Sequence, residues 1–465
     1  MWGVVVASLA GTVLYSQPAP ADADSGAPDR AALSASNRRI VDRLANGLFR
    51  CPDKSWPGWK AGSLGILLVD VPKESAVIMR GAASPLDNVT LAPVSYASLP
   101  SHLKQKRLGH AAIPWLLMER MLAVHHASSD EAEIDRVVGL VLHESFHLTG
   151  QSWTGGTFAR GAHFPDDARL RYLRRRIIEE LRQAAQTNDA GGVAFWLREL
   201  REKHGRDQKR LLKLDAVEGT AEYVEAIGSS IASHGCDAGE KIILEAAFAR
   251  LDAKWRDTSA QSVTMFPEVE AYVIGAYSGL LLRRAGRPAW QKTVENGQPM
   301  LDLLVEQVAA QARAEDPELQ TRIREEVKRR NDLIKPKLEE LLASLQSPAH
   351  TVVSLPAARL GNLSPRHGFV TYDAGEANDV LVLLGARGRA YPDDLFATLE
   401  FSGQDILLSS RTPCGAYRQA VFAVPRDSAR EVGHGVKIVD EHVIGQTGTA
   451  MKRADKKVPW LCVSP

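Results

Sequence analysis

One run of eleven residues constrains the fold more than any other feature of the chain. Residues 137–147 read VVGLVLHESFH, which is apolar on nearly every side and contains the pattern His-Glu-x-x-His. On an α-helix, His143 and His147 lie one turn apart and project from the same face. The apolar surroundings predict a buried helix, which holds its side chains stiffly. The sequence therefore predicts a protein built around an internal helix that carries two histidines.

Two imidazoles at this spacing are typical zinc ligands, and the residue between them is typical of a general base. A pair of neutral histidines four residues apart on a helix can bind one Zn²⁺. Glu144 is then placed to accept a proton from a metal-activated water. The alternative is a pair of core histidines satisfied by hydrogen bonds. We favour the metal site, because burying these polar groups without a partner would be costly.

A tetrahedral catalytic zinc needs a third protein ligand and an open position for water. The residues after His147 begin like a His-x-x-Gly-x-x-His pattern, but its last position is Trp153, which cannot bind zinc. A second predicted helix, residues 215–225, offers Glu218 and Glu222 one turn apart. The remaining candidates for the third ligand are Glu225, Asp215 and His163.

The two motifs together resemble the gluzincin metallopeptidases, which include thermolysin-like enzymes and aminopeptidases. The resemblance consists of His-Glu-x-x-His and the later Glu-Gly-x-Ala-x-Tyr at residues 218–223. In that family the glutamate that opens the second motif is the third zinc ligand, which implies Glu218. Thermolysin-like members carry an aspartate four residues later that orients a ligating histidine, which implies this role for Glu222. The gap between the motifs is longer than in aminopeptidases and implies an inserted helical segment.

The resemblance also implies a tyrosine that stabilises the oxyanion of a tetrahedral intermediate. An apolar predicted helix at residues 269–283 contains Tyr272 and Tyr277, and Tyr223 lies in the second motif. We expect Tyr277 or Tyr223 in this role, with Tyr272 as a further candidate. Each is otherwise a core tyrosine.

Gluzincins also place a sheet over the active-site cleft, where its edge strand pairs with the peptide substrate. Two strand-like runs, residues 64–71 and 76–80, are separated by a turn and predict an antiparallel hairpin. This hairpin is the candidate for that sheet.

The type of secondary structure that the sequence predicts changes along the chain, which indicates several domains. It has 465 residues and a net charge of +1, enough for two or three domains and without a reason to expect nucleic acid. We predict an α+β fold with a β-rich accessory domain at 349–465, where short strand-like runs are split by Gly, Pro, Asp and Asn. Residues 24–113 form an N-terminal α/β part with a small sheet, and residues 114–348 a mainly helical, zincin-like catalytic region.

Two charged stretches are predicted to face solvent. Residues 169–176 read RLRYLRRR and lie on an amphipathic pattern followed by glutamates. We interpret them as a solvated helix face with i,i+4 ion pairs, the alternative being a surface for an anionic substrate or a membrane. Residues 317–346 predict a charged helix that also faces solvent.

The N-terminus predicts export. Residues 1–15 are almost wholly apolar and precede small-x-small sites, which resembles a signal peptide over residues 1–23. An uncleaved N-terminal anchor is the alternative. No other segment approaches 18 apolar residues, so we expect no stable membrane insertion of the mature chain and a periplasmic or secreted location.

The cysteine pattern permits disulfide bonds. The four cysteines contain no Cys-x-x-Cys pair, which argues against a zinc knuckle, and an even number in an exported protein permits two disulfides. The pairs that we favour are Cys51–Cys236 and Cys414–Cys462. The alternative is four buried free thiols.

These features together favour a zinc-dependent metallopeptidase that acts on a peptide or protein substrate. His143, His147 and Glu218 would bind Zn²⁺, and Glu144 would act as general base. The alternatives are a non-catalytic zinc-binding or interaction protein on the same fold, a metal-dependent hydrolase of other amides or esters, and a metal-free helical scaffold. The lack of a Gly-x-Met-x-Asn type motif favours internal over N-terminal cleavage.

Overall fold

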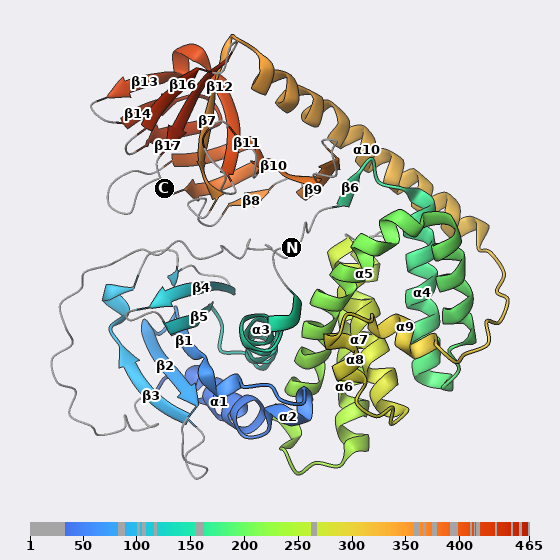
Figure 1. Ribbon diagram of the computed structural model, residues 1–465. Coiled ribbons are helices and arrows are strands. Elements are labelled where there is room, and N and C mark those ends of the chain that lie inside the picture. The colour runs from blue at the N-terminus through green and yellow to red at the C-terminus, as the bar shows by residue number, and fades with distance from the viewer. Residues whose placement is uncertain are drawn as a thin grey trace. The chain divides into compact units, whose positions relative to one another are not determined.

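The computed structural model describes most of the chain from residue 33 onward, so the expected signal peptide lies outside the described residues. The described ranges are 33–81, 89–99, 103–104, 108–115, 119–154, 162–261, 267–357, 363–365, 369–373, 379–390, 399–409, 412, 414, 419–432, 435–447, 450–454 and 458–463. They divide into two compact units. The larger unit contains the described residues up to 154 and from 168 to 323, and the smaller unit contains residues 162–167 and those from 324 onward (Figure 1).

The larger unit begins with a five-stranded sheet of strand order β3-β2-β1-β5-β4. Its strands are β1 (Gly65–Asp70), β2 (Ser75–Gly81), β3 (Val89–Val94), β4 (Gly109–Trp115) and β5 (Glu119–His126). The predicted hairpin is confirmed, because β1 and β2 pair antiparallel with Leu67 opposite Ile78. Strand β1 also pairs in parallel with β5. Both strands of the hairpin are therefore interior strands, and the edges of the sheet are β3 and β4 instead.

The expectation that the chain is helical from residue 114 onward is wrong for its first part. Strand β5 occupies residues 119–126, and the first long helix, α3 (Glu131–Thr149), begins after it. The described core of β5, Met121 to Val124, is buried on both faces of the sheet. A strand covered on both faces is a continuous apolar run, which periodicity cannot distinguish from a short buried helix.

Each face of the sheet has its own cover. On one face, Leu67 and Val69 pack with Leu99 and Leu103, which follow β3. On the other, α1 (Ala35–Leu44) packs against β1 and α3 packs against β5. Helix α3 also packs against α5 (Gly191–His234), so it lies between the sheet and the helices that follow (Figure 1). This central position explains why its sequence is apolar nearly all the way round.

The rest of the larger unit is helical, as the sequence predicts. After the short α2 (Pro52–Ser55), its helices are α3, α4 (Ala168–Thr187), α5, α6 (Glu240–Gln261), α7 (Pro267–Arg284), α8 (Trp290–Glu295) and α9 (Met300–Val305). Helix α5 is kinked at His204, whose φ of −134° and ψ of 35° are not helical. Its second half carries the acidic motif and packs against both α3 and α7.

The basic stretch of α4 is only partly a solvated face, which corrects the expectation. Arg175 and Arg176 do pair with Glu179, at 3.0 and 2.7 Å. Arg171 and Arg174, by contrast, are each only 1% exposed. A buried guanidinium must be paired, and the acids that pair with these two come from other helices, which a single helical pattern does not reveal.

The smaller unit is rich in β-structure, as predicted. One sheet connects its strands: β6 (Ala162–Phe164), β7 (His350–Pro356), β8 (Ser364–Pro365), β9 (Phe369–Asp373), β10 (Asp379–Ala390), β11 (Leu399–Ser409), β12 (Gln419–Pro425), β13 (Ala429–Val432), β14 (Gly435–Val439), β15 (Val443–Gln446), β16 (Ala450–Ala454) and β17 (Pro459–Val463). Phe401 and Phe422 pack edge to face in its core, 5.3 Å apart.

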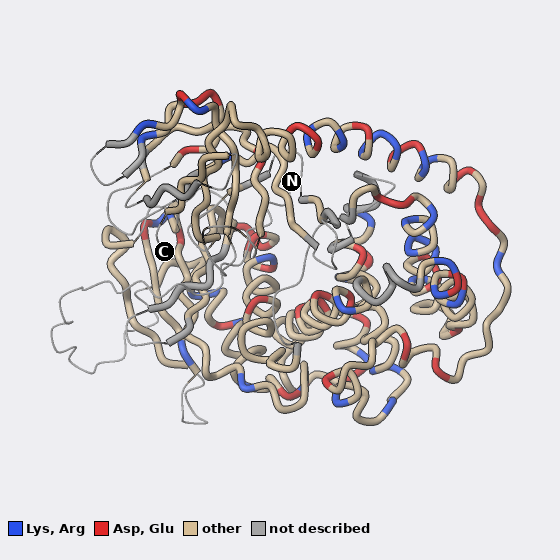
Figure 2. Tube along the Cα trace, turned by 45° about the horizontal axis from the view of Figure 1, so that its top comes forward, with Lys and Arg blue, Asp and Glu red and all other residues tan. Residues whose placement is uncertain are grey.

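The two units divide within helix α10 (Pro317–Gln346), earlier than the expected boundary after Pro348. Charges of both signs alternate along this helix, as the sequence predicts (Figure 2). It also carries a buried apolar stripe, so it does not face solvent on all sides. Ile334, Leu338 and Leu341 pack with Val370, Val382 and Leu384 of the smaller unit's own sheet.

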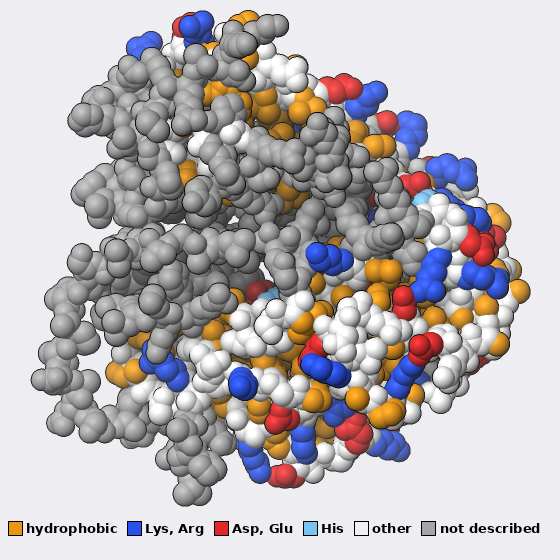
Figure 3. All heavy atoms as spheres, viewed as in Figure 1, with side chains coloured by type: hydrophobic (Ala, Val, Ile, Leu, Met, Phe, Trp, Pro, Cys, Tyr) orange, Lys and Arg blue, Asp and Glu red, His pale blue; other side chains and the backbone are white. Residues whose placement is uncertain are grey.

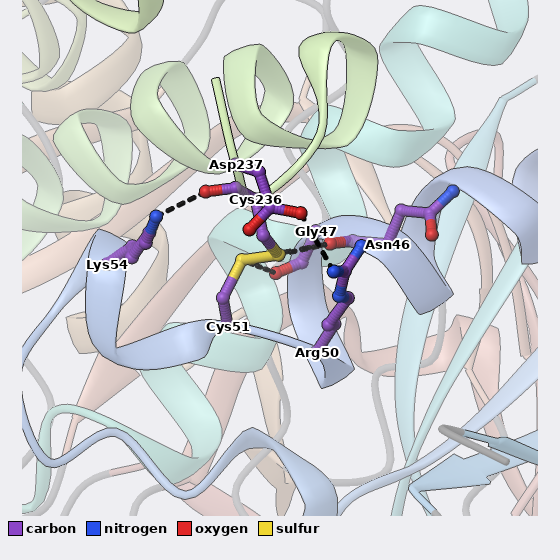
Figure 4. The surroundings of a disulfide bond; sticks show 7 residues. All are labelled: Asn46, Gly47, Arg50, Cys51, Lys54, Cys236 and Asp237. Atoms are coloured by element: carbon purple, nitrogen blue, oxygen red, sulfur yellow. Dashed lines mark hydrogen bonds and ion pairs between the residues drawn. A yellow bond between two sulfur atoms is a disulfide. The ribbon is translucent and has the colours of Figure 1, made fainter. Parts of the chain in front are cut away.

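Both predicted disulfides are confirmed. Cys51 bonds Cys236 in the larger unit, and Cys414 bonds Cys462 in the smaller one. Figure 4 shows the first, which joins the turn before α2 to the turn after α5. Two disulfides indicate an oxidising location, as for exported proteins.

Two surface properties of the described residues bear on partners. Within the described ranges, every helix is too short or too polar to span a bilayer. On the face drawn in Figure 3, basic, acidic and apolar side chains are interspersed over the described surface of the larger unit.

Candidate metal centre

Helix α3 presents its histidines in its last two turns. Its first turn is capped by Asp130, whose side chain accepts a hydrogen bond of 2.6 Å from the Glu133 amide. Its last turn closes at Gly150, whose amide donates to the carbonyl of Phe146 at 2.8 Å. Capping at both ends satisfies backbone groups that burial would otherwise leave without a partner. The helix thereby carries two imidazoles into the interior without fraying.

Helix α5 approaches α3 closely because glycine replaces a side chain where they meet. A Cβ atom at Gly228 would lie 2.9 Å from a methyl carbon of Leu142, which is closer than real Cβ contacts. The Glu218 side chain of α5 is only 1% exposed. The acidic motif is therefore pressed against the histidine-bearing helix rather than exposed on a solvated face.

Three side chains from the two helices converge. The Nε2 atoms of His143 and His147 are 3.0 Å apart. One oxygen of Glu218, Oε2, lies 3.6 Å from Nε2 of His143 and 3.3 Å from Nε2 of His147. These three residues form a group whose ligand atoms lie close enough together to hold one metal ion.

The spacing of the three atoms fits a small tetrahedral cation. Zinc bonds to nitrogen and oxygen of about 2.0–2.1 Å place any two ligand atoms of a tetrahedron about 3.3–3.4 Å apart. The three observed separations, 3.0, 3.3 and 3.6 Å, bracket this value. Two imidazoles and a carboxylate are also a donor set that Zn²⁺ accepts, with a fourth position for a water or substrate.

The far side of each imidazole faces a polar side chain. The Nδ1 atom of His147 lies 2.6 Å from Oε1 of Gln151. An amide oxygen can only accept, so Nδ1 carries the proton and Nε2 keeps its lone pair for a cation. The Nδ1 atom of His143 lies 3.3 Å from Oε2 of Glu225 and 3.8 Å from Oε2 of Glu222. Glu225 is therefore closer to His143 than Glu222, for which the sequence predicts the orienting role.

A lysine on α6 pairs with both of these acids. Lys254 donates to both carboxylate oxygens of Glu222 at 2.6 Å, and it lies 3.7 Å from Glu225. Burial raises the pKa of Glu222. Burial alone would also raise the pKa of Glu225, but the Lys254 charge and the bond to His143 hold it below its ordinary value. Lys254 thus offsets the repulsion between these two carboxylates beside the metal-ligand candidates.

The acidic surroundings favour positive charge on His143. Burial lowers the pKa of His143, but hydrogen bonds to Glu218 and Glu225 and the nearby Glu144 outweigh it and raise that pKa to about 10. The same negative environment attracts a divalent cation. Glu144, the general-base candidate, is half-buried on the same turn of α3.

Asp215, another candidate for the third ligand, is paired with an arginine instead. The carboxylate of Asp215 is engaged by both terminal nitrogens of Arg174, at 2.7 and 3.0 Å. Arg174 also donates from Nε to Glu270 of α7 at 2.7 Å, and Arg171 donates to the same oxygen at 2.5 Å. His163 belongs to β6 of the smaller unit, and its side chain lies outside the described part.

Two of the three tyrosine candidates are hydrogen-bonded to residues other than the metal-ligand candidates. The Tyr277 hydroxyl donates to Asp252 at 2.5 Å, and burial raises its pKa. The Tyr223 hydroxyl accepts from Arg283 at 3.3 Å, and its ring packs edge-on against Trp290. Neither hydroxyl is directed at the three ligand candidates.

The tyrosine that reaches the candidate metal centre is the third candidate, Tyr272. Its ring packs edge-on against the His143 imidazole, with the centroids 5.5 Å apart. The Lys254 ammonium lies 5.8 Å from the centroid of the same ring.

Two residues of this site are not apparent from the motifs. Gln151 stands in a stretch that reads as a loop, yet it lies four residues after His147, the spacing that places side chains on one helix face. That spacing was the available signal. Lys254 has no such signal, because only the packing of α6 brings it to Glu222.

Comparison with known proteins adds no relationship. No family model matches the chain, no curated protein matches it, and no solved structure matches it.

Proposed function

We propose that this protein is a zinc-dependent metallopeptidase with a zincin-like catalytic region, of the gluzincin type. The observation that carries the proposal is the convergence of His143 Nε2, His147 Nε2 and Glu218 Oε2 within 3.0–3.6 Å of one another in the interior. Because the Nδ1 atom of His147 is bonded to Gln151 and that of His143 lies 3.3 Å from Glu225, both Nε2 atoms are turned toward this point. A bound cation would compensate the cost of holding two imidazoles and an acid together in the interior.

Zinc bound by these three residues would lower the pKa of water toward about 7 and polarise a substrate carbonyl. Glu144 accepts the proton of the attacking water and later delivers it to the leaving amine. His143 and His147 hold their positions through the partners on their Nδ1 atoms. The Tyr272 ring packs on His143 and restricts the direction of that imidazole.

The sheet offers a place for an extended substrate. Strand β4 stands at the end of the strand order, and its neighbour β5 packs against α3. An edge strand presents backbone groups that can pair with an added strand, which is a common way to bind peptides. This is compatible with a peptide substrate and favours β4, rather than the β1–β2 hairpin, as the strand that would pair with it.

Metal binding and hydrolysis, measured on the full chain, test the proposal. We expect one zinc per chain, and zinc-dependent cleavage within a panel of internally quenched peptides. Glu218→Gln should weaken zinc binding by at least about tenfold, because it removes a charged ligand. Glu245→Gln, an exposed acid on α6, is the matched control and should change neither.

The possible outcomes separate the alternatives. Zinc binding at His143, His147 and Glu218 without cleavage of any peptide would identify a zinc-binding protein and refute the peptidase. A protein that binds no zinc would refute both.

A further inference from the structure

Gln151 occupies a position from which it reaches both helices of the candidate metal centre. It follows the last turn of α3, where its backbone amide donates to the Phe146 carbonyl at 3.0 Å. Its side chain is buried, with 4% of the residue exposed. The contacts of its amide group lie on two different elements, α3 and α5.

The contacts with α5 fix the orientation of this amide. Its Nε2 lies 2.6 Å from the carbonyl oxygen of Val217 and 2.5 Å from the hydroxyl of Thr220. A backbone carbonyl can only accept, so the amide nitrogen and not the oxygen must face Val217. The Thr220 hydroxyl donates to the Ala216 carbonyl at 2.7 Å, which leaves its oxygen free to accept from Gln151. These contacts thus fix which group donates and which group accepts in each hydrogen bond of the amide with α5.

The orientation of the amide fixes the tautomer of His147. Because Nε2 of Gln151 faces α5, its Oε1 faces the Nδ1 atom of His147, at 2.6 Å. That nitrogen must donate, so the imidazole proton resides on Nδ1. The other nitrogen then offers a lone pair toward Glu218 and His143.

The same amide also sets the separation of the two helices. Val217 and Thr220 lie on either side of Glu218, on the turn of α5 that presents it. One side chain therefore joins an imidazole of α3 to the backbone that carries the carboxylate of α5. A shift of either helix would break two of its three short hydrogen bonds.

We propose that Gln151 is a positioning residue for the metal centre: it holds His147 in the Nδ1–H tautomer and fixes the distance between His147 and Glu218. The part of this that concerns metal affinity rests on the proposed function. The tautomer and the helix separation are properties of the chain itself and hold without a metal.

Nitrogen NMR of the metal-free full chain, labelled with ¹⁵N-histidine, tests the tautomer. The His147 resonances, assigned by their loss in His147→Asn, should have the Nδ1–H pattern at a pH where the ring is neutral. In Gln151→Met, which has similar volume but no hydrogen-bonding amide, we expect the pattern to move toward the Nε2–H form. Gln183→Met, an exposed glutamine on α4, is the matched control and should leave it unchanged.

Zinc affinity, measured by chelator competition, is the second readout. Gln151→Met should weaken zinc binding about 10–100-fold, as is typical when a partner of a ligating histidine is lost. If that variant does not fold, Gln151→Asn replaces it, because the shorter amide cannot reach His147 and Val217 together and should give the same changes.

The results distinguish the two proposals. An unchanged tautomer together with a zinc affinity within about twofold of wild type would overturn the role of Gln151. A wild-type chain that binds no zinc would overturn the metallopeptidase, whereas a tautomer change in Gln151→Met would still support the positioning role.

Discussion

Gly219 of α5 and Gly275 of α7 cross so closely that neither position has room for a Cβ atom. A Cβ at Gly219 would lie 2.5 Å from the Cα of Gly275, and one at Gly275 would lie 2.4 Å from the Cα of Gly219. The obstacle on each side is backbone, which cannot rotate away. Gly219 directly follows Glu218, so this crossing sets how far the carboxylate enters the site.

We expect Gly219→Ala to destabilise the larger unit by about 1–3 kcal/mol, because the two helices must separate to admit one methyl group. The free energy of unfolding in urea measures this. Gly62→Ala is the matched control, since a Cβ there would meet only the Cα of Gly81 at an ordinary 4.0 Å. Equal stabilities of the two variants would contradict the packing argument. Zinc affinity should fall in Gly219→Ala as well, because Glu218 moves with the helix.

Glu144→Gln should separate metal binding from turnover. The substitution keeps the shape of the side chain but removes the base that accepts the proton of water, so kcat should fall by about 10²–10⁴-fold. Zinc content should remain one per chain, because Glu144 is not among the three converging ligands. Undiminished hydrolysis in Glu144→Gln would exclude it as the general base.

Arg174→Met should be strongly destabilising. Arg174 is the only described partner that we find for both oxygens of Asp215, and its loss leaves a buried carboxylate without a cation beside it. Breaking a buried pair in this way costs about 3–5 kcal/mol, measurable by thermal or urea unfolding. Adding Asp215→Asn should recover part of the loss. Arg198→Met, which removes an exposed arginine, should change stability little.

The Cys51–Cys236 disulfide should stabilise the larger unit by closing a long segment of chain. Its cysteines are 185 residues apart, against 48 for Cys414–Cys462. Replacing Cys51 and Cys236 with serine should lower the free energy of unfolding by about 2–5 kcal/mol, and by more than the same change at the other pair. Denaturant titration of both double variants checks this order. A larger loss from the Cys414 and Cys462 variant would argue against a loop-length effect.

The sequence predicted those parts of the fold that are determined by residues close together in the chain. The helix around His143 could be predicted because its motif spacing and its apolar neighbours agree. The β1–β2 hairpin could be predicted because a turn separates two β-rich runs. The boundary within α10 could not, because its apolar stripe is diluted by charges and its partners come from distant strands.

Some residues of the candidate site could likewise be predicted from local sequence, and others could not. Glu218 could be identified because its motif is local, and the structure brings it to both histidines. The choice between Glu222 and Glu225 as partner of His143 could not be made from the sequence. The two acids lie about one turn apart on the same face of α5, and only the packing of α5 against α3 decides which is nearer. The burial of Arg174 was equally hidden, because its acids lie on two other helices.

Strand β6 pairs in parallel with β9, although residues of the larger unit precede and follow it in the chain. The sheet of the smaller unit is thus assembled from two separate stretches of sequence. A fragment that starts at residue 349 would lack both this strand and the α10 stripe, leaving the apolar side chains of Val370 and Val382 uncovered. Such a fragment should aggregate on expression. A single proteolytic cut near β6 should likewise loosen this sheet, although its other strands lie about 190 or more residues later in the chain.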